Sequence, residues 1–185
     1  MKDRETDINK LIIENSLQSF FFDKLQEVNK KASRPVSNES IYYLSMVLDQ
    51  FGESARLFEE EEGKLREKVL GIKLLEASNL PDSQKKRCLK EIGDTALFVS
   101  GYFHESLNSK IIDVGYYENL GQIAYKNLDG FFPKAYEVPS FYKNLSKRFS
   151  CLTNLVSIIS QDFFSNNLGE MAYLIVSDKN KVKVS

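Results

Sequence analysis

The chain has 185 residues, of which 42% are hydrophobic and 12% aromatic. This composition excludes intrinsic disorder, which requires low hydrophobicity and a high net charge, and the length suits one domain with a sizeable core. The 25 basic and 26 acidic residues leave a formal net charge of −1, so the basic excess of a typical nucleic-acid-binding protein is missing, and we expect no nucleic-acid partner.

Two helices are predicted in the first 52 residues. Apolar side chains recur at helical spacing after Ser16 and stop at a proline-containing turn. The second helix is predicted to begin near Ser37 or Asn38, which are both good N-caps, and to end at Gly52. Residues 1–14 are left irregular, because their short apolar run fits a strand or a helix equally well.

A polar segment and a third helix are predicted next. Four consecutive glutamates occupy residues 59–62. Adjacent side chains on a helix point in different directions, so this run favours a solvated face over a cation site. The third helix is expected to end before Pro81, which then stands at the start of a fourth helix that reaches about Phe103.

The second half of the chain predicts two further helices. One carries an apolar stripe from Tyr117 to Phe131. The other is expected to begin in the turn at Pro139 and to continue unbroken to Phe163, for about seven turns. For the tail we favour the end of a helix over a hairpin, followed by frayed residues 178–185.

The segment spanning residues 89–103 differs from the other helices because it is apolar or small on both faces. A helix with this pattern lies in the interior of a bundle. Gly93 and Gly101 each weaken it by about 1 kcal/mol relative to alanine, so we expect neighbouring helices to approach closely there. The sequence therefore predicts an all-α, single-domain bundle of about six to seven helices around this central helix, over residues 1–185.

Asp94 lies in this central segment, on the side of Leu97, Phe98 and Gly101. A buried carboxylate must be paired, hydrogen-bonded or protonated, because an isolated charge is too costly in a low dielectric. Two interpretations stay open: a structural ion pair or hydrogen bond to a neighbouring helix, and a functional carboxylate in an internal pocket.

The same segment carries a resemblance. The pattern GD-x-x-LF-x-x-G-x-F at residues 93–103, followed by Glu105-Ser106-Leu107 and by Tyr116-Tyr117 before Gly121, resembles a stretch in uncharacterised bacterial all-helical proteins. The similarity covers the middle third of the chain. It implies a helical fold and a bacterial source, and it supplies no catalytic residues.

Known catalytic and cofactor motifs are missing from the sequence. His104, next to Glu105, is the single histidine, so it cannot supply the paired Glu-x-x-His motifs of a dicarboxylate metal bundle. Zinc sites need about four clustered ligands, and no phosphate-binding loop or nucleophile elbow is present. We therefore predict no catalytic residue, metal or cofactor, and keep Asp94, His104 and Glu105 as ligand-binding or structural candidates.

Adjacent aromatic residues suggest contact surfaces. In a helix, two adjacent side chains lie about 100° apart, so one ring can enter the core while the other reaches the surface. On this ground Tyr42, Tyr116 and Tyr117 are the interaction candidates.

The basic cluster at residues 85–90 is interpreted as a solvated face, with docking to an acidic partner as the alternative. The two cysteines are expected to be buried and reduced.

These observations favour a non-catalytic protein-interaction or regulatory module that binds a protein partner or itself. The alternative is a ligand-binding or sensor bundle with a small molecule in a pocket near Asp94, and a small enzyme is the third hypothesis.

The sequence shows no signal peptide and no apolar run of the ~18–20 residues that a membrane span requires. We therefore expect no membrane partner and a cytoplasmic location.

Overall fold

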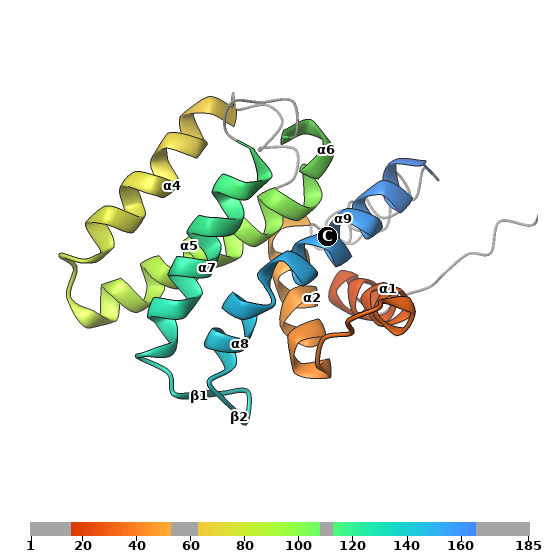
Figure 1. The fold of residues 1–185 in the computed structure, drawn as a ribbon, viewed down its shortest axis with the longest axis horizontal. Helices are drawn as coiled ribbons and strands as arrows, with labels where there is room; N and C mark the ends of the chain where they lie inside the picture. Colours follow the sequence, from red (N-terminus) through yellow and green to blue (C-terminus); the bar gives the residue numbers. More distant parts are fainter. Residues whose placement is uncertain (1–15, 53–62, 108–112, 166–185) are drawn as a thin grey trace, which may run out of the picture.

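The computed structural model describes residues 16–52, 63–107 and 113–165 (Figure 1). Within these ranges the chain forms helices joined by short turns, and a single two-stranded hairpin. The elements are α1 (Leu17–Lys31), α2 (Asn38–Gly52), α4 (Gly63–Ala77), α5 (Asp82–Tyr102), α6 (His104–Leu107), α7 (Val114–Asp129), β1 (Lys134–Ala135), β2 (Val138–Pro139), α8 (Phe141–Lys147) and α9 (Phe149–Ser165). The prediction of an all-α bundle is confirmed.

Serine side chains cap the first two helices, and the sequence predicts the second of these caps. The hydroxyl of Ser16 accepts a hydrogen bond from the backbone N–H of Ser19 at the start of α1, with a length of 3.1 Å. Ser37 caps α2 in the same way, through the N–H of Ser40 at 3.3 Å. Such bonds satisfy backbone donors that have no partner within the helix. The beginnings of α1 and α2 are therefore set by local sequence.

The predicted central helix is α5, which packs against α2, α4, α7 and α9. Figure 1 shows it crossing behind α7 in the middle of the molecule, with α4 outside it. Its buried residues follow one another almost without interruption: Leu89, Ile92, Gly93, Asp94, Ala96, Leu97, Phe98, Val99, Ser100 and Gly101. An amphipathic surface helix would bury only one stripe. The prediction that this segment forms the centre of the bundle is confirmed.

Glycines on α5 and α7 allow the close approach that the sequence predicts. A Cβ atom added to Gly93 would overlap the ring of Tyr125, and one added to Gly101 would lie 2.5 Å from Cβ of Val156. On α7, a Cβ at Gly121 would overlap the ring of Phe149. At each position the missing side chain lets a buried side chain of another helix lie directly against the backbone.

The prediction of one long helix from Pro139 to Phe163 is wrong. Pro139 belongs to β2, and the helix is divided into α8 and α9 at Arg148, where the backbone leaves helical geometry (φ −105°, ψ 13°). The guanidinium group of Arg148 donates hydrogen bonds to the carbonyl oxygens of Arg34 and Pro35, at 2.8 and 2.7 Å. These bonds fix the junction against the α1–α2 connection, a distant contact that local periodicity does not reveal.

Cys88 and Cys151 are both free thiols. We predicted that they are fully buried, but the structure places both of them half-buried. The predictions for residues 1–14, 59–62 and 178–185 lie outside the described residues. None of the helices in the described ranges has both the length and the apolar character needed to cross a bilayer.

Candidate functional site

The carboxylate of Asp94 lies at a junction of three helices. Tyr43 on α2 and Tyr125 on α7 both donate hydrogen bonds to its Oδ1 atom, at 2.5 and 2.8 Å. Lys90, one turn earlier on α5, bonds the other oxygen, Oδ2, at 2.5 Å. We refer to these four residues as the Asp94 cluster.

Local sequence explains how each donor reaches this carboxylate. Lys90 and Asp94 stand four residues apart, which places them on the same face of α5. Tyr43 points inward with 1% of its surface exposed, while its neighbour Tyr42 points outward with 46% exposed. Gly93 has no side chain, so the Tyr125 ring can lie against α5 with its hydroxyl at Asp94.

Burial keeps the two phenols in their neutral, donating form. It raises the pKa of Tyr43 well above the usual range, and the neighbouring Tyr125 and Asp94 raise it further. Burial also raises the pKa of Tyr125, with the negative charge of Asp94 as the next cause. Asp94 itself is 2% exposed and receives hydrogen bonds on both oxygens from within the protein. Such a carboxylate is stabilised in place, with little surface left for a substrate.

The other polar candidates do not join Asp94. His104 follows it by ten positions, roughly 15 Å along a helix axis. Glu105 is exposed and accepts a hydrogen bond from the side chain of Gln161 at 3.1 Å. In the described ranges, no group of three or more His, Cys, Asp and Glu residues is placed to hold a metal ion. His104 and Glu105 stand together at the start of α6, apart from Asp94.

The three tyrosines predicted for interaction differ in exposure. Tyr42 is on the surface, but Tyr117 is only 3% exposed and belongs to the core. Tyr116 is half-buried and packs against α4, where a Cβ on Gly71 would lie 2.5 Å from its hydroxyl oxygen. The pairing of one inward and one outward ring holds for Tyr42 and Tyr43, whereas neither Tyr116 nor Tyr117 offers a fully exposed ring.

A strained hairpin, which sequence reasoning missed, lies beside the Asp94 cluster. β1 and β2 pair antiparallel and are joined by two residues, Tyr136 and Glu137, whose φ angles are 50° and 60°. Hairpin turns of two residues with positive φ strongly prefer Asn-Gly or similar pairs, because other L-residues are strained there. Since neither residue is a turn former, the sequence carried no signal for this hairpin.

The turn places the Tyr136 ring on the aromatic part of the cluster. Its centroid lies 5.7 Å from that of Tyr43 and 4.9 Å from that of Phe141. The ring is nevertheless 41% exposed. Partial burial raises the pKa of Tyr136, and Asp94 and Tyr42 raise it further.

Phe132, just before β1, adds a second exposed ring close to the hairpin. It is 38% exposed, and its ring centroid lies 6.0 Å from that of Tyr142, which is 5.9 Å from that of Tyr43. We call the exposed residues Phe132 and Tyr136 the aromatic face. Both come from the α7–α8 connection, and the neighbouring buried rings of Phe141 and Tyr142 contact them. Tyr42 contacts Phe22 of α1 instead.

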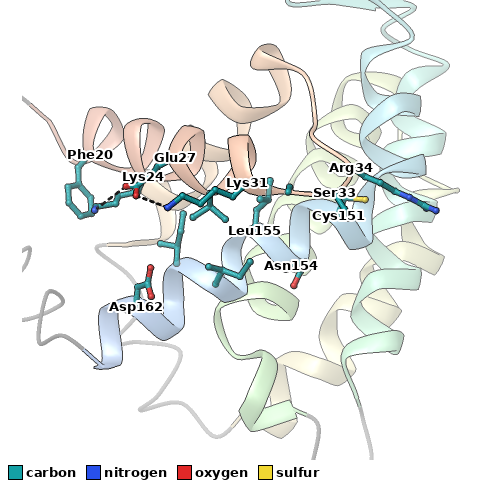
Figure 2. A pocket seen from close by; sticks show the side chains of 14 residues that line it. Phe20, Lys24, Glu27, Lys31, Ser33, Arg34, Cys151, Asn154, Leu155 and Asp162 are labelled. Carbon is teal, nitrogen blue, oxygen red and sulfur yellow. Dashed lines mark hydrogen bonds and ion pairs between the residues drawn. The ribbon is translucent and has the colours of Figure 1, made fainter.

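A second surface feature is a groove of about 520 Å³ between α1 and α9 (Figure 2). Its apolar lining includes Phe20 and Val28 from α1 and Leu155 and Ile158 from α9. Charged side chains also line it, and Figure 2 shows Lys24 and Lys31 both paired with Glu27, at 3.8 and 3.2 Å. The groove lies on different elements from the Asp94 cluster, and sequence reasoning did not anticipate it.

These features define the candidate sites: a buried carboxylate whose cluster reaches solvent only through Lys90, the aromatic face beside it, and a separate groove between α1 and α9. The resemblance to bacterial helical proteins stays a prediction. The chain matches no family model, and comparisons with curated proteins and with solved structures find no similar protein.

Proposed function

We propose that this chain is a non-catalytic protein-interaction module of a bacterial cytoplasm, and that it binds a protein partner through the aromatic face. The observation that carries the proposal is the strained turn at Tyr136 and Glu137, which holds an aromatic ring partly in solvent. Strained backbone of this kind costs about 1–3 kcal/mol per residue and clusters at functional sites.

The composition of the face supports binding to protein. Tyrosine and phenylalanine are enriched at the centres of protein interfaces, where a rigid ring buries a large area at a low cost in conformational entropy. The Tyr136 ring is already held against Tyr43 and Phe141. The ring therefore loses little conformational entropy when a partner binds, and this favours a higher affinity.

The buried carboxylate of Asp94 supports a non-catalytic role. A catalytic carboxylate must reach the reacting atoms of a substrate. Asp94 is 2% exposed, and both of its oxygens accept hydrogen bonds from the protein. Its geometry suits a structural support for the aromatic face better than a general base.

A ligand-binding function, at a different place from the predicted pocket near Asp94, is favoured by the groove between α1 and α9. Its volume of about 520 Å³ falls within the ordinary range for small-molecule sites, and its lining is largely apolar. Native mass spectrometry of the purified protein tests this alternative. A bound molecule whose retention is reduced by Ile158→Gln, a change at an exposed lining residue, would favour it, and a mass equal to that of the chain alone would count against it.

The interaction proposal is tested by comparing Tyr136→Ser with Leu75→Ser. Both change an exposed side chain, but Leu75 lies on α4, away from the aromatic face, and is 76% exposed. Each variant is used as bait in native bacterial lysate after its thermal unfolding has been compared with that of the wild type. We expect a partner that wild type and Leu75→Ser retain and that Tyr136→Ser loses.

Two results would contradict the proposal. One is a partner retained equally by both variants. The other is a protein that light scattering shows to be strictly monomeric and that retains no partner. If Tyr136→Ser lowers the unfolding temperature, Tyr136→Phe and Phe132→Ser replace it, because the first keeps the buried ring contacts and the second lies outside the strained turn.

A further inference from the structure

Lys86 on α5 lies at the edge of the aromatic face in an unusual setting. Its ammonium nitrogen is 5.5 Å from the ring centroids of both Phe131 and Phe132. The side chain is half-buried. Two aromatic rings therefore hold the cation in one place by cation–π attraction, unlike the freely moving end of an ordinary surface lysine.

This ammonium has no acidic partner among the residues that the structure describes. Other lysines nearby are neutralised: Lys90 by Asp94 and Lys134 by Glu137. The carboxylate of Asp129, at the end of α7, accepts the backbone N–H of Lys143 at 3.0 Å. Among the described residues, Lys86 thus presents a fixed ammonium without an ion pair beside Phe132, which is itself part of the aromatic face.

We infer that the partner segment bound by the aromatic face is acidic, with an aromatic or apolar side chain that rests on Phe132 and Tyr136 while a neighbouring carboxylate bonds Lys86. A charge-assisted hydrogen bond to a cation that is already positioned and partly desolvated is stronger than one to a mobile surface lysine. The exposed Arg87 and the half-buried Lys85 add positive potential on the same segment of α5. This inference rests on the proposed function.

Charge complementarity favours an acidic protein segment over nucleic acid. A nucleic acid is bound by neutralising many phosphates, which requires a broad basic surface. The whole chain has a net charge of −1, and the lysines at 90 and 134 are already paired with carboxylates of the protein. One fixed cation bordered by aromatic rings suits a single carboxylate next to an apolar anchor.

The probe for this inference is a fluorescently labelled random copolymer of glutamate and tyrosine, titrated with the full chain and followed by anisotropy. The comparison probes are polyglutamate, a copolymer of lysine and tyrosine, and single-stranded DNA. We expect the glutamate–tyrosine copolymer to bind more tightly than any of these. Lys86→Met should weaken its binding about tenfold, the value of one charge-assisted hydrogen bond, and should reduce its salt dependence.

Two further variants serve as controls. Lys126→Met removes an exposed lysine of α7, a different helix from that of Lys86, and should leave binding unchanged. Lys86→Arg keeps the charge and should bind like the wild type, so it separates loss of charge from loss of fold. Equal binding by wild type and Lys86→Met would overturn the inference, as would tighter binding of DNA or of the lysine–tyrosine copolymer.

The partner retained from lysate separates this inference from the proposed function. Loss of the partner by both Tyr136→Ser and Lys86→Met supports both. Loss by Tyr136→Ser alone overturns the acidic-segment inference and leaves the interaction module standing. Retention by both variants overturns both.

Discussion

Lys90 and Asp94 lie one turn apart on α5, and the lysine bonds the carboxylate oxygen that the two tyrosine donors leave free. The cluster therefore joins α2, α5 and α7 through a single carboxylate. An ion pair of this kind contributes little net stability by itself, but removing its carboxylate leaves the buried phenols of Tyr43 and Tyr125 without their acceptor. This asymmetry makes the role of Asp94 measurable.

Asp94→Ala should lower the free energy of unfolding by about 3–5 kcal/mol, because the mutation leaves Lys90 and two buried phenols without their acceptor. Asp94→Asn should cost less, since its amide oxygen can still accept from the tyrosines. Urea denaturation measures both values. An unchanged midpoint for Asp94→Ala, combined with lost binding to a ligand or partner, would instead identify a functional carboxylate.

Alkaline pH should destabilise the protein from about pH 10 upward. Burial raises the pKa of Tyr43 and Tyr125 in the folded state, whereas tyrosines in the unfolded chain ionise near pH 10. The stability that these phenols contribute is thus fully present below pH 10 and is lost as the pH rises above it. Phenolate absorbance and helical circular dichroism, followed together, should show these two residues ionising only as the helices unfold.

A double variant shows whether Tyr43 and Tyr125 are the source of the phenolate absorbance that appears on unfolding. Tyr43→Phe/Tyr125→Phe should reduce the phenolate absorbance gained in the unfolding step by the contribution of two of the nine tyrosines. If all the phenols ionised while the helical signal stayed intact, the buried hydrogen-bonded arrangement would be wrong.

Gly121→Ala should destabilise the protein by about 1 kcal/mol or more. Alanine has the better helix propensity, but its Cβ would overlap the buried ring of Phe149, and overpacking costs about 1–3 kcal/mol. Gly130→Ala is the control, because Gly130 has φ −62° and a Cβ there meets only an ordinary contact at 3.5 Å. That variant should be neutral or stabilising by up to about 1 kcal/mol. Thermal unfolding of the two variants should shift in opposite directions or differ clearly in size.

Glu137→Gly should raise the free energy of unfolding by about 0.5–1 kcal/mol. Glycine relieves the strain at φ 60°, and part of this gain is offset by the greater freedom of glycine in the unfolded chain. Glu137→Gln removes the exposed ion pair with Lys134 but keeps the strain, so it should be close to neutral. Equal stability of the two variants in urea would show that the turn stores no strain.

Cys88 should react slowly with a disulfide reagent at mildly alkaline pH. Burial raises the pKa of its thiol, and the negative charge of Glu91 raises it further, so less of the reactive thiolate is present. The rate is measured in a Cys151→Ser background. Glu91→Gln should increase it at a given pH, whereas an unchanged rate would show that Glu91 does not act on this thiol.

The central helix and the beginnings of α1 and α2 could be predicted from the sequence. Serine caps act through bonds to a backbone N–H three residues away, and an all-round apolar pattern identifies an interior helix whatever its neighbours are. The burial of Asp94 and the close contacts at Gly93 and Gly101 follow from that pattern, because a carboxylate or a glycine in an interior helix needs a specific neighbour.

Only the tertiary structure decided which neighbours those are. Tyr43 and Tyr125 reach Asp94 from 51 and 31 residues away, and Arg148 ends α8 while it bonds carbonyls more than a hundred residues earlier. The hairpin at Tyr136 lacks turn-forming residues and is held by rings from α2 and α8. Local periodicity records how each residue relates to its own helix, whereas these contacts depend on the way separate helices are packed together.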